Sequence, residues 1–537
     1  MVRDLNDEPT NDDLIKEQLF TLKHDNMKRT LLFFAALFAM VAYAQEPLRT
    51  AVRNIDPPHL NYDGCIEGSG NCRYLIFHDR LLNDFIKLSR DIVVEVAKDG
   101  SKSNVLNIER NMDFKFLAAY EDNENVYMLY RRSNYYTREF TLYLNTVPKE
   151  AGIDKWKPKE LLTLKRDLSD GFQMGTAVSP DKSKVALLLL QVKTAGMFEK
   201  DKSDKLKGSA VMVFEGDKIK MSKPLEFDVE NNTLQFLDLS IDNNGEVLLA
   251  LASFNAKKED EGKKGSPKVT LDPNETVHIY KITEDEVVSS SSATEFGHVS
   301  NGRLLVTKSG QTILGGYYSP ESQKPEEGSY LLTIDASFAN TNISNEKFPE
   351  EYFTYKHPKV TKSIRDFRAV PIELFAFENG TITLLGEMRA YQSNMVTLFN
   401  LAGPTLVSMA DNTGNLTDFQ MVTKHQITSL SDSPSLLFSY HAIMKDNLVH
   451  LIYTDNLTNL TTGTNEPLEI KDYSFKGKCA AHRTLDSEGH LSEPEMLMDY
   501  TAYKSVLFVP LSIESDGLWI YHSEKNDGTV SWLPHNF

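Results

Sequence analysis

The sequence has little cysteine, an excess of acidic over basic residues, and no long hydrophobic run after its first 44 residues. Three cysteines in two distant places do not make a zinc site. Acidic residues outnumber basic ones by 76 to 58. This argues against nucleic acid as a partner, because neutralising phosphates requires clustered lysine and arginine. A membrane span needs roughly 20 apolar residues, so we expect no transmembrane anchor in the mature chain.

Short motifs with a known chemistry are also missing. The sequence contains no G-x-S-x-G, no Walker loop and no H-E-x-x-H. The stretch DLSIDNNGE has alternating carboxylates, but it lacks the acidic residue that completes a calcium loop, so we interpret it as a hairpin. Seven of the 13 histidines follow residue 424, and their spacings do not require them to converge. We therefore predict no metal site and no cofactor.

An export signal is present at residues 27–44. Lys28 and Arg29 form a basic head, an apolar run follows from Leu31 to Ala42, and the small residues Ala42 and Ala44 flank Tyr43. This order is typical of a secretory signal peptide. We predict cleavage before Gln45 and a periplasmic or extracellular location.

Residues 1–26 fit poorly in front of such a signal, because an acidic head disfavours export. We interpret them as an N-terminal extension that results from a start codon assigned too early. The first 44 residues hold 7 acids and 5 bases, so the mature chain keeps a net charge near -16 of the total -18.

Cys65 and Cys72 enclose the glycine-rich stretch CIEGSGNC. In an oxidising compartment these two residues are candidates for a small disulfide, although the spacing alone is weak evidence. Cys479 would remain a buried thiol.

One pattern recurs through the chain: a turn rich in Asp, Asn, Gly or Ser, followed by a run of β-branched and apolar residues. IDNNGEVLLALA and FENGTITLLGEM are two of seven copies. Equivalent apolar positions are 59 to 70 residues apart. These positions are Val126, Val185, Val247, Ile313, Ile382, Val449 and Trp519. Further apolar stretches before and after each turn predict three or four antiparallel strands per copy.

Such a repeat predicts an all-β fold, a β-propeller of seven blades of about 60–70 residues. Six or eight blades remain alternatives, because residues 72–106 also read as part of a blade. The last copy has no room for a fourth strand. We therefore expect residues 45–106 to form an N-terminal segment that closes the ring, with DIVVEVA from Asp91 as the best candidate strand. Residues 107–537 would form the blades.

Two charged insertions interrupt this pattern, QVKTAGMFEKDKSDKLKGS and FNAKKEDEGKKGSPKVTLDPNE. We expect them between the second and third strands of their blades, as solvated loops on one rim. They would either frame a partner site or represent loop drift on an exposed edge.

The candidate ligand site lies in the blades around Ile382 and Val449. Glu387, Arg389 and Tyr391 alternate in LLGEMRAYQ, which places them on one face of a strand. The following segment adds further polar and aromatic candidates: Lys424, Gln426, Tyr440 and His441. Mixed charge with aromatic rings suits an oligosaccharide, a peptide or an organic acid. The alternative is a set of hydrogen bonds and ion pairs between blades.

Three stretches carry a family resemblance: FENGTITLLGEMRAYQ, then KHQITSLSDSPSLLFSYHAIMKDNLVHLIYTDNLTNL, then KGKCAAHRTLDSEGH. They resemble a group of uncharacterised secreted proteins of Bacteroidetes, over about residues 370–525 and more weakly from residue 110. The resemblance implies a propeller-like fold and an envelope or extracellular location. It implies no reaction, so no catalytic residue is carried over.

Two functions are compatible with these features. The first is a non-catalytic binding or scaffold module that holds a protein or a glycan at the cell envelope. The alternative is a glycan-processing hydrolase or lyase with its site in the channel mouth. Glycoside hydrolysis needs two carboxyl groups roughly 5–9.5 Å apart, and Glu387 is the one inward candidate that the sequence places.

Overall fold

The computed structural model describes most of the chain after residue 48. The described residues are 49–55, 60–67, 72–79, 90–97, 103–109, 114–134, 139–149, 157–165, 170–193, 205–228, 232–258, 269–299, 301–321, 324–355, 367–393, 398–429, 440–462, 468–470, 476–501, 507–514, 517–524 and 527–534. They all belong to one unit, Arg49–Phe537.

Within these residues the chain is almost entirely β-structure, organised in eight sheets of mainly antiparallel strands. The first four sheets in chain order consist of β2 (Leu60–Glu67), β3 (Cys72–Asp79), β4 (Arg90–Ala97) and β5 (Ser103–Glu109); β6 (Phe114–Glu121), β7 (Asn125–Asn134), β8 (Glu139–Pro148) and β9 (Lys159–Lys165); β10 (Asp170–Val178), β11 (Lys184–Lys193), β12 (Lys205–Glu215) and β13 (Lys218–Asp228); and β14 (Asn232–Ile241), β15 (Val247–Lys258), β16 (Val269–Ile282) and β17 (Val287–Thr294).

The other four sheets are less regular. They consist of β18 (His298–Val299), β19 (Arg303–Val306), β20 (Thr312–Ser319), β21 (Gly328–Ile334) and β22 (Thr341–Lys347); β23 (Arg368–Ala376), β24 (Ile382–Ser393), β25 (Leu398–Ala410), β26 (Leu416–Val422), β27 (Gln426–Ser429) and β30 (Leu468–Ile470); β28 (Tyr440–Lys445), β29 (Leu448–Asn456), β31 (Lys478–Leu485) and β32 (Glu495–Asp499); and β33 (Leu507–Glu514), β34 (Gly517–Glu524), β35 (Asp527–Pro534) and β1 (Arg49–Ile55). Two short helices, α2 (Glu350–Thr354) and α3 (Leu457–Thr462), lie in connections. No helix in the described part of the chain is long and apolar enough to span a membrane.

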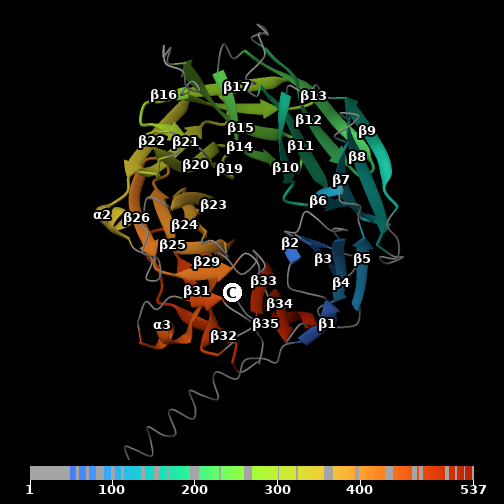
Figure 1. Cartoon of the computed structure of the whole chain (residues 1–537). Helices are drawn as coiled ribbons and strands as arrows, with labels where there is room; N and C mark the ends of the chain where they lie inside the picture. Colours follow the sequence, from blue (N-terminus) through green and yellow to red (C-terminus); the bar gives the residue numbers. More distant parts are fainter. Residues whose placement is uncertain are drawn as a thin grey trace, which may run out of the picture. The chain divides into compact units, whose positions relative to one another are not determined.

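The sheets follow one another like the blades of a propeller (Figure 1). The strands that precede the second strand of consecutive sheets contact each other, as β6 contacts β10, β10 contacts β14, β14 contacts β19 and β19 contacts β23. Figure 1 shows these strands toward the middle of the ring and β9, β13, β17 and β22 at its outside. The all-β, propeller-like class predicted from the repeat is therefore present.

The identity of the closing strand differs from the prediction, and the described sheets match the alternative of eight blades, not the favoured seven. Eight sheets are described because β2 to β5, within residues 60–109, form a sheet of their own. The segment DIVVEVA belongs to β4, which lies between β3 and β5 in the middle of that sheet, and it does not close the ring. Closure by an N-terminal strand does occur, but through β1, which pairs antiparallel with β35.

The seven equivalent apolar positions all lie in the second strand of a sheet, from Val126 in β7 to Trp519 in β34. The predicted turns connect the first and second strands. Several of them are closed by an aspartate: Asp242 Oδ1 accepts hydrogen bonds from the backbone N–H groups of Asn244 at 3.0 Å and Glu246 at 2.7 Å. The aspartate carboxylate thus accepts hydrogen bonds from backbone N–H groups that have no backbone acceptor in a tight turn.

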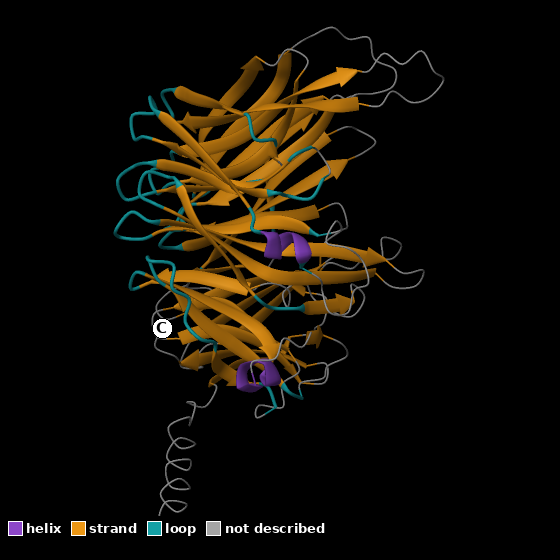
Figure 2. Cartoon of the chain, turned by 90° about the vertical axis from the view of Figure 1, so that its left-hand side faces the viewer, coloured by secondary structure: helices purple, strands orange, loops and turns teal. Residues whose placement is uncertain are grey.

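The described short turns between first and second strands lie on one side of the ring (Figure 2). Both charged insertions fall between second and third strands, as predicted, since β11 ends at Lys193 before β12 begins at Lys205, and β15 ends at Lys258 before β16 begins at Val269. The prediction that the whole stretches are loops is wrong at their ends, because residues 191–193, 205–209, 254–258 and 269–275 belong to these strands. The residues between these strands lie outside the described part.

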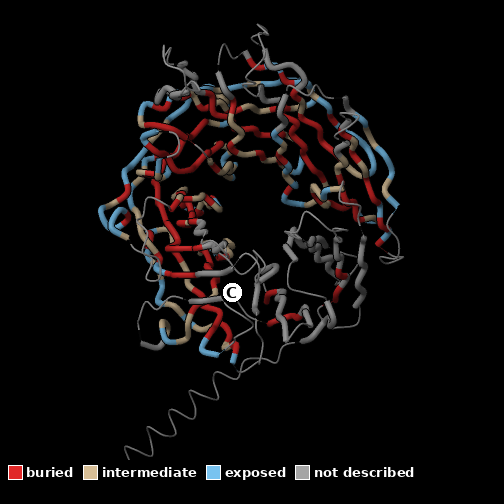
Figure 3. Tube along the Cα trace, in the orientation of Figure 1, coloured by how far each residue is buried: buried red, intermediate tan, exposed pale blue. Residues whose placement is uncertain are grey.

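The core lies between consecutive sheets. One apolar cluster joins Leu188 and Val213 to Leu249 of the next sheet, and another joins Leu385 and Val407 to Leu451. Burial of one such side chain contributes about 1.5–3 kcal/mol, against about 1 kcal/mol for a hydrogen bond, so apolar packing dominates cohesion between sheets. Because both faces of a sheet are covered, middle strands are buried continuously (Figure 3).

Candidate functional site

Five of the inner strands share a backbone irregularity that shapes the inner wall of the ring. In these five, the register with the second strand of the sheet skips one residue, which leaves that residue bulged out of the ladder. The skipped positions are Asp63 in β2, Leu117 in β6, Leu237 in β14, Ile372 in β23 and Leu511 in β33. A bulge frees backbone groups that a neighbouring strand can then bind.

Side chains from adjacent sheets use these freed groups. Gln173 Oε1 of β10 accepts a hydrogen bond from the backbone N–H of Phe236 in β14 at 3.1 Å. Thr176 Oγ1 donates to the carbonyl of Leu117 in β6, at 3.3 Å. Consecutive inner strands are thus joined by hydrogen bonds between a side chain of one strand and the backbone of the next, which we call latches, as well as by apolar packing.

Two further latches contain charged groups. Asp238 Oδ2 accepts from the backbone N–H of Leu304 in β19 at 2.8 Å. Arg303 Nε donates to the carbonyl of the bulged Ile372 in β23 at 2.9 Å, and its Nη1 lies 3.4 Å from Asp238 Oδ1. Asp238 and Arg303 therefore link three consecutive sheets, β14–β17, β18–β22 and β23–β27.

Glu373, next to the bulged Ile372, completes a group that we call the inner-wall triad: Asp238, Arg303 and Glu373. Glu373 is exposed, the Arg303 side chain is 43% exposed and that of Asp238 is 16% exposed. Desolvation raises the pKa of both carboxyl groups; Arg303 opposes the rise in each, and Asp238 adds to it at Glu373. The sequence analysis did not identify these residues, because their proximity depends on three sheets.

The predicted candidates Glu387 and Lys424 form a buried ion pair. Glu387 lies in β24 and is 0% exposed; Lys424, between β26 and β27, is 2% exposed. Lys424 Nζ donates to Glu387 Oε1, and Arg389 Nε donates to Glu387 Oε2 at 2.6 Å. Burial would raise the pKa of Glu387, but the two cations outweigh it and lower that pKa. Glu387 is therefore held as a carboxylate.

Tyr440 and His441, at the start of β28, flank this pair. The Lys424 ammonium lies 5.9 Å from the centre of the Tyr440 ring, which is cation–π distance. The Tyr440 hydroxyl is buried and has no hydrogen-bond partner in the described part of the chain. Burial lowers the pKa of His441 to about 4, so its imidazole is neutral at pH 7.

Gln426 links two sheets, since its Nε2 donates to the carbonyl of Thr454 in β29 at 2.9 Å. Its strand, β27, also pairs in parallel with β30, which the β29–β31 connection contributes. Tyr391 lies in β24 opposite Asn400, but its side chain is outside the described residues. The structure thus brings Glu387, Arg389, Lys424 and Tyr440 together and places Gln426 and His441 beside them.

Asp455 in β29 is an acidic residue of this region that the sequence analysis missed. It is 6% exposed and accepts hydrogen bonds from Asn459 Nδ2 at 2.7 Å and from the backbone N–H of Asn456 at 2.8 Å. Burial raises its pKa to about 6, although Lys424 and Arg483 oppose the rise. The Lys424 ammonium group therefore interacts electrostatically with two buried carboxyl groups, those of Glu387 and Asp455.

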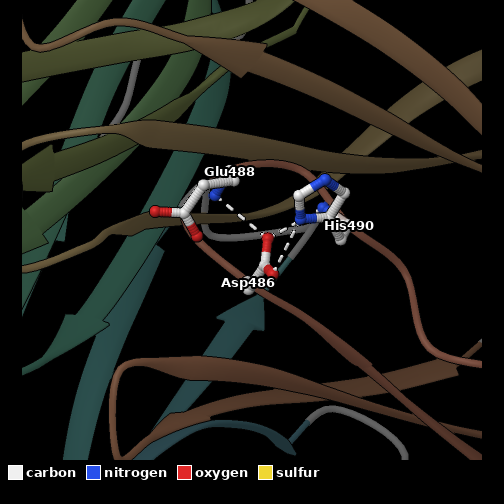
Figure 4. A group of neighbouring side chains, drawn as sticks. All are labelled: Asp486, Glu488 and His490. Atoms are coloured by element: carbon white, nitrogen blue, oxygen red, sulfur yellow. Dashed lines mark hydrogen bonds and ion pairs between the residues drawn. The ribbon is translucent and has the colours of Figure 1, made fainter.

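Asp486, Glu488 and His490 form a group whose ligand atoms lie within 4.8 Å of one another (Figure 4). Asp486 Oδ1 accepts from the backbone N–H groups of Glu488 at 3.0 Å and His490 at 2.8 Å. Asp411 binds the backbone of its own hairpin in the same way, through Thr413 and Asn415. The arrangement is accordingly that of a repeated turn.

The two cysteines proposed for a disulfide lie in neighbouring strands, β2 and β3. The register places Cys65 opposite Leu75 and Cys72 opposite Ala97 of β4. Their side chains are outside the described residues, so the bond stays a prediction. Cys479 is buried and free, as expected.

No family model and no curated protein matches the chain. Among solved structures, the acylaminoacyl peptidase of Pyrococcus horikoshii is 11% identical, with a TM-score of 0.32, covering 87% of this chain and 58% of the peptidase; this chain thus spans under two thirds of the peptidase's length. A polysaccharide lyase, PL25 ulvan lyase, is 10% identical over 78% of this chain and 92% of its own, with a TM-score of 0.33. The GH93 α-L-arabinofuranosidase of Fusarium graminearum is 11% identical over 63% and 92%, with a TM-score of 0.29. Likenesses at these TM-scores carry no argument about function.

Proposed function

We propose that this protein is an exported, non-catalytic binding module of the cell envelope that holds a glycan or a protein. The observation that carries the proposal is the state of Glu387, the carboxyl group that the sequence offers for catalysis. A general acid or base must exchange a proton with its substrate near neutral pH. Glu387 is instead fully buried and bound to two cations, which keep it ionised.

A binding role uses the ring as a rigid frame. The sheets pack through apolar clusters, and side-chain hydrogen bonds join the inner strands of five of them, β6, β10, β14, β19 and β23, so that polar groups on the inner wall are held by several contacts. Preorganised polar groups reduce the entropy lost on binding.

The export part of the proposal is tested by producing the full chain in a Gram-negative host and fractionating the cells. We expect the protein in the periplasm or the medium, with a mature N-terminus at Gln45 by mass spectrometry. An uncleaved N-terminus in the cytoplasm would contradict export.

The binding part is tested by following the melting temperature of the purified protein in the presence of oligosaccharides, peptidoglycan fragments, organic acids and divalent metals. A ligand of the native state raises this temperature by mass action. Each oligosaccharide is also assayed for new reducing ends and for unsaturated products. Turnover of any of them would overturn the non-catalytic assignment in favour of the hydrolase or lyase alternative.

A further inference from the structure

The inner-wall triad contains one carboxylate that the fold does not use. Asp238 and Glu373 occupy the same position in their strands, immediately after the bulged residues Leu237 and Ile372. Asp238 binds the backbone N–H of Leu304 in the next sheet. Glu373 makes no hydrogen bond or ion pair with any described residue, and it is exposed on the inner strand β23.

The Glu373 carboxylate, which has no partner among the described residues, differs from that of an ordinary surface glutamate. Desolvation raises its pKa, Arg303 opposes the rise and Asp238 adds to it, although the side chain itself is exposed. Among the described residues, the buried hydroxyl of Tyr440, on the first strand of the next sheet, also lacks a partner. The fields of Glu373 and Glu387 contribute, after burial, to raising the pKa of Tyr440, so the phenol lies within electrostatic reach of both. A buried hydroxyl in this condition requires water or a ligand, whereas the exposed Glu373 carboxylate offers acceptor oxygens to a ligand on the inner wall.

The charges of the triad restrict the ligand. Asp238 neutralises Arg303, whose Nε is already used by Ile372, so the guanidinium offers spare N–H donors and no free positive charge. Glu373 adds acceptors and a net negative charge. The carboxylates of such a surface accept hydrogen bonds from hydroxyl groups, and Arg303 donates hydrogen bonds to oxygen atoms of the ligand. The net negative charge of the surface repels an anion.

We propose that the inner-wall triad binds a neutral oligosaccharide, with Glu373 accepting hydrogen bonds from sugar hydroxyls and Arg303 donating to their oxygens. This inference rests on the proposed function and narrows it to a glycan at a stated place. Uronic acids are poor ligands because the net negative charge of the triad, which Glu373 supplies, repels their carboxylates.

The test uses the purified protein with cellotriose, mannotriose and maltotriose as neutral probes, a chitosan trimer as cationic probe and a galacturonic acid trimer as acidic probe. Dissociation constants are measured by calorimetry. We expect at least one neutral trisaccharide to bind at least about tenfold more tightly than the acidic trimer, since like charges in an interface cost several kcal/mol.

The matched variants are Glu373→Ala and Glu346→Ala. Glu346 is exposed on the outer strand β22, away from the inner wall. Glu373→Ala should weaken binding of the neutral trisaccharide about tenfold and leave the melting temperature unchanged, because no contact of the fold is lost. Glu346→Ala should change neither quantity.

Three outcomes would overturn the inference and leave the proposed function standing: unchanged affinity in Glu373→Ala, tightest binding of the acidic or the cationic trimer, or binding of an envelope protein and no oligosaccharide. The binding part of the proposed function fails if the protein turns a glycan over or captures neither a glycan nor an envelope protein.

Discussion

At the residue scale, the most consequential group is the buried ion pair of Glu387 and Lys424. Both side chains are 0% exposed, and Arg389 completes the group. Removing charged groups from water is expensive, and the pair compensates only while both members are present. These charges join β24 to the segment before β27, within reach of β28 and β29.

We predict that Glu387→Gln lowers the free energy of unfolding by about 3 to 5 kcal/mol, because it leaves the Lys424 ammonium buried without its counter-charge. Urea denaturation measures the effect. Glu346→Gln, on the exposed face of β22, is the control and should unfold like the unchanged protein. Equal midpoints for the two variants would show that Glu387 is not held as described.

Asp455 gives a prediction about pH. Its pKa is about 6 in the folded protein and 3.8 for the ordinary group, so the folded state binds the proton more tightly. The stability it contributes is fully present below pH 3.8 and is lost as pH rises through 6. Over this window the loss is about 3 kcal/mol.

Asp455→Asn should remove this part of the pH dependence, because the amide keeps an acceptor for Asn456 and Asn459 and does not titrate. The measurement is the free energy of unfolding at several pH values between 3.5 and 7. If the variant and the unchanged protein lose stability in parallel, Asp455 is not the titrating group.

At the element scale, the aspartate-closed hairpin is the recurring device. In the turn between β25 and β26, Asp411 Oδ1 accepts from the backbone N–H groups of Thr413 and Asn415, both at 2.9 Å. Gly414 adopts a φ of +88°, which favours glycine. The side chain and the glycine together set the register of the following strand.

We predict that Asp411→Ala destabilises the protein by about 1 kcal/mol, the usual contribution of such hydrogen bonds. Asp411→Asn retains the accepting oxygen and serves as the matched control, with an effect close to zero. Thermal melts of the two variants decide the matter. The idea fails if both lose the same stability.

At the scale of the whole molecule, the pairing of β1 with β35 joins the two ends of the described chain. Without β1, the outer edge of β35 would present unpaired backbone groups, and such edges promote association between molecules. A closed ring also prevents the first and last sheets from separating.

Replacing residues 49–55 by a Gly/Ser segment of equal length should therefore lower the melting temperature and produce oligomers. Light scattering after size exclusion detects them. The same replacement at residues 45–48, just before β1, is the control and should leave a monodisperse protein of unchanged mass. A monodisperse, equally stable β1 variant would show that ring closure does not need this strand.

The sequence by itself determined the strand-rich repeat, the seven second strands, the place of both insertions and the grouping of Glu387 with Lys424. These features depend on local patterns, since alternating turns and β-branched runs form hairpins whatever lies next to them. The tertiary structure decided between the alternatives of seven and eight sheets and selected the closing strand, because strand pairing between chain ends depends on long-range geometry. It also decided the inner-wall triad, whose three residues, 135 positions apart from first to last, meet only when three sheets pack side by side.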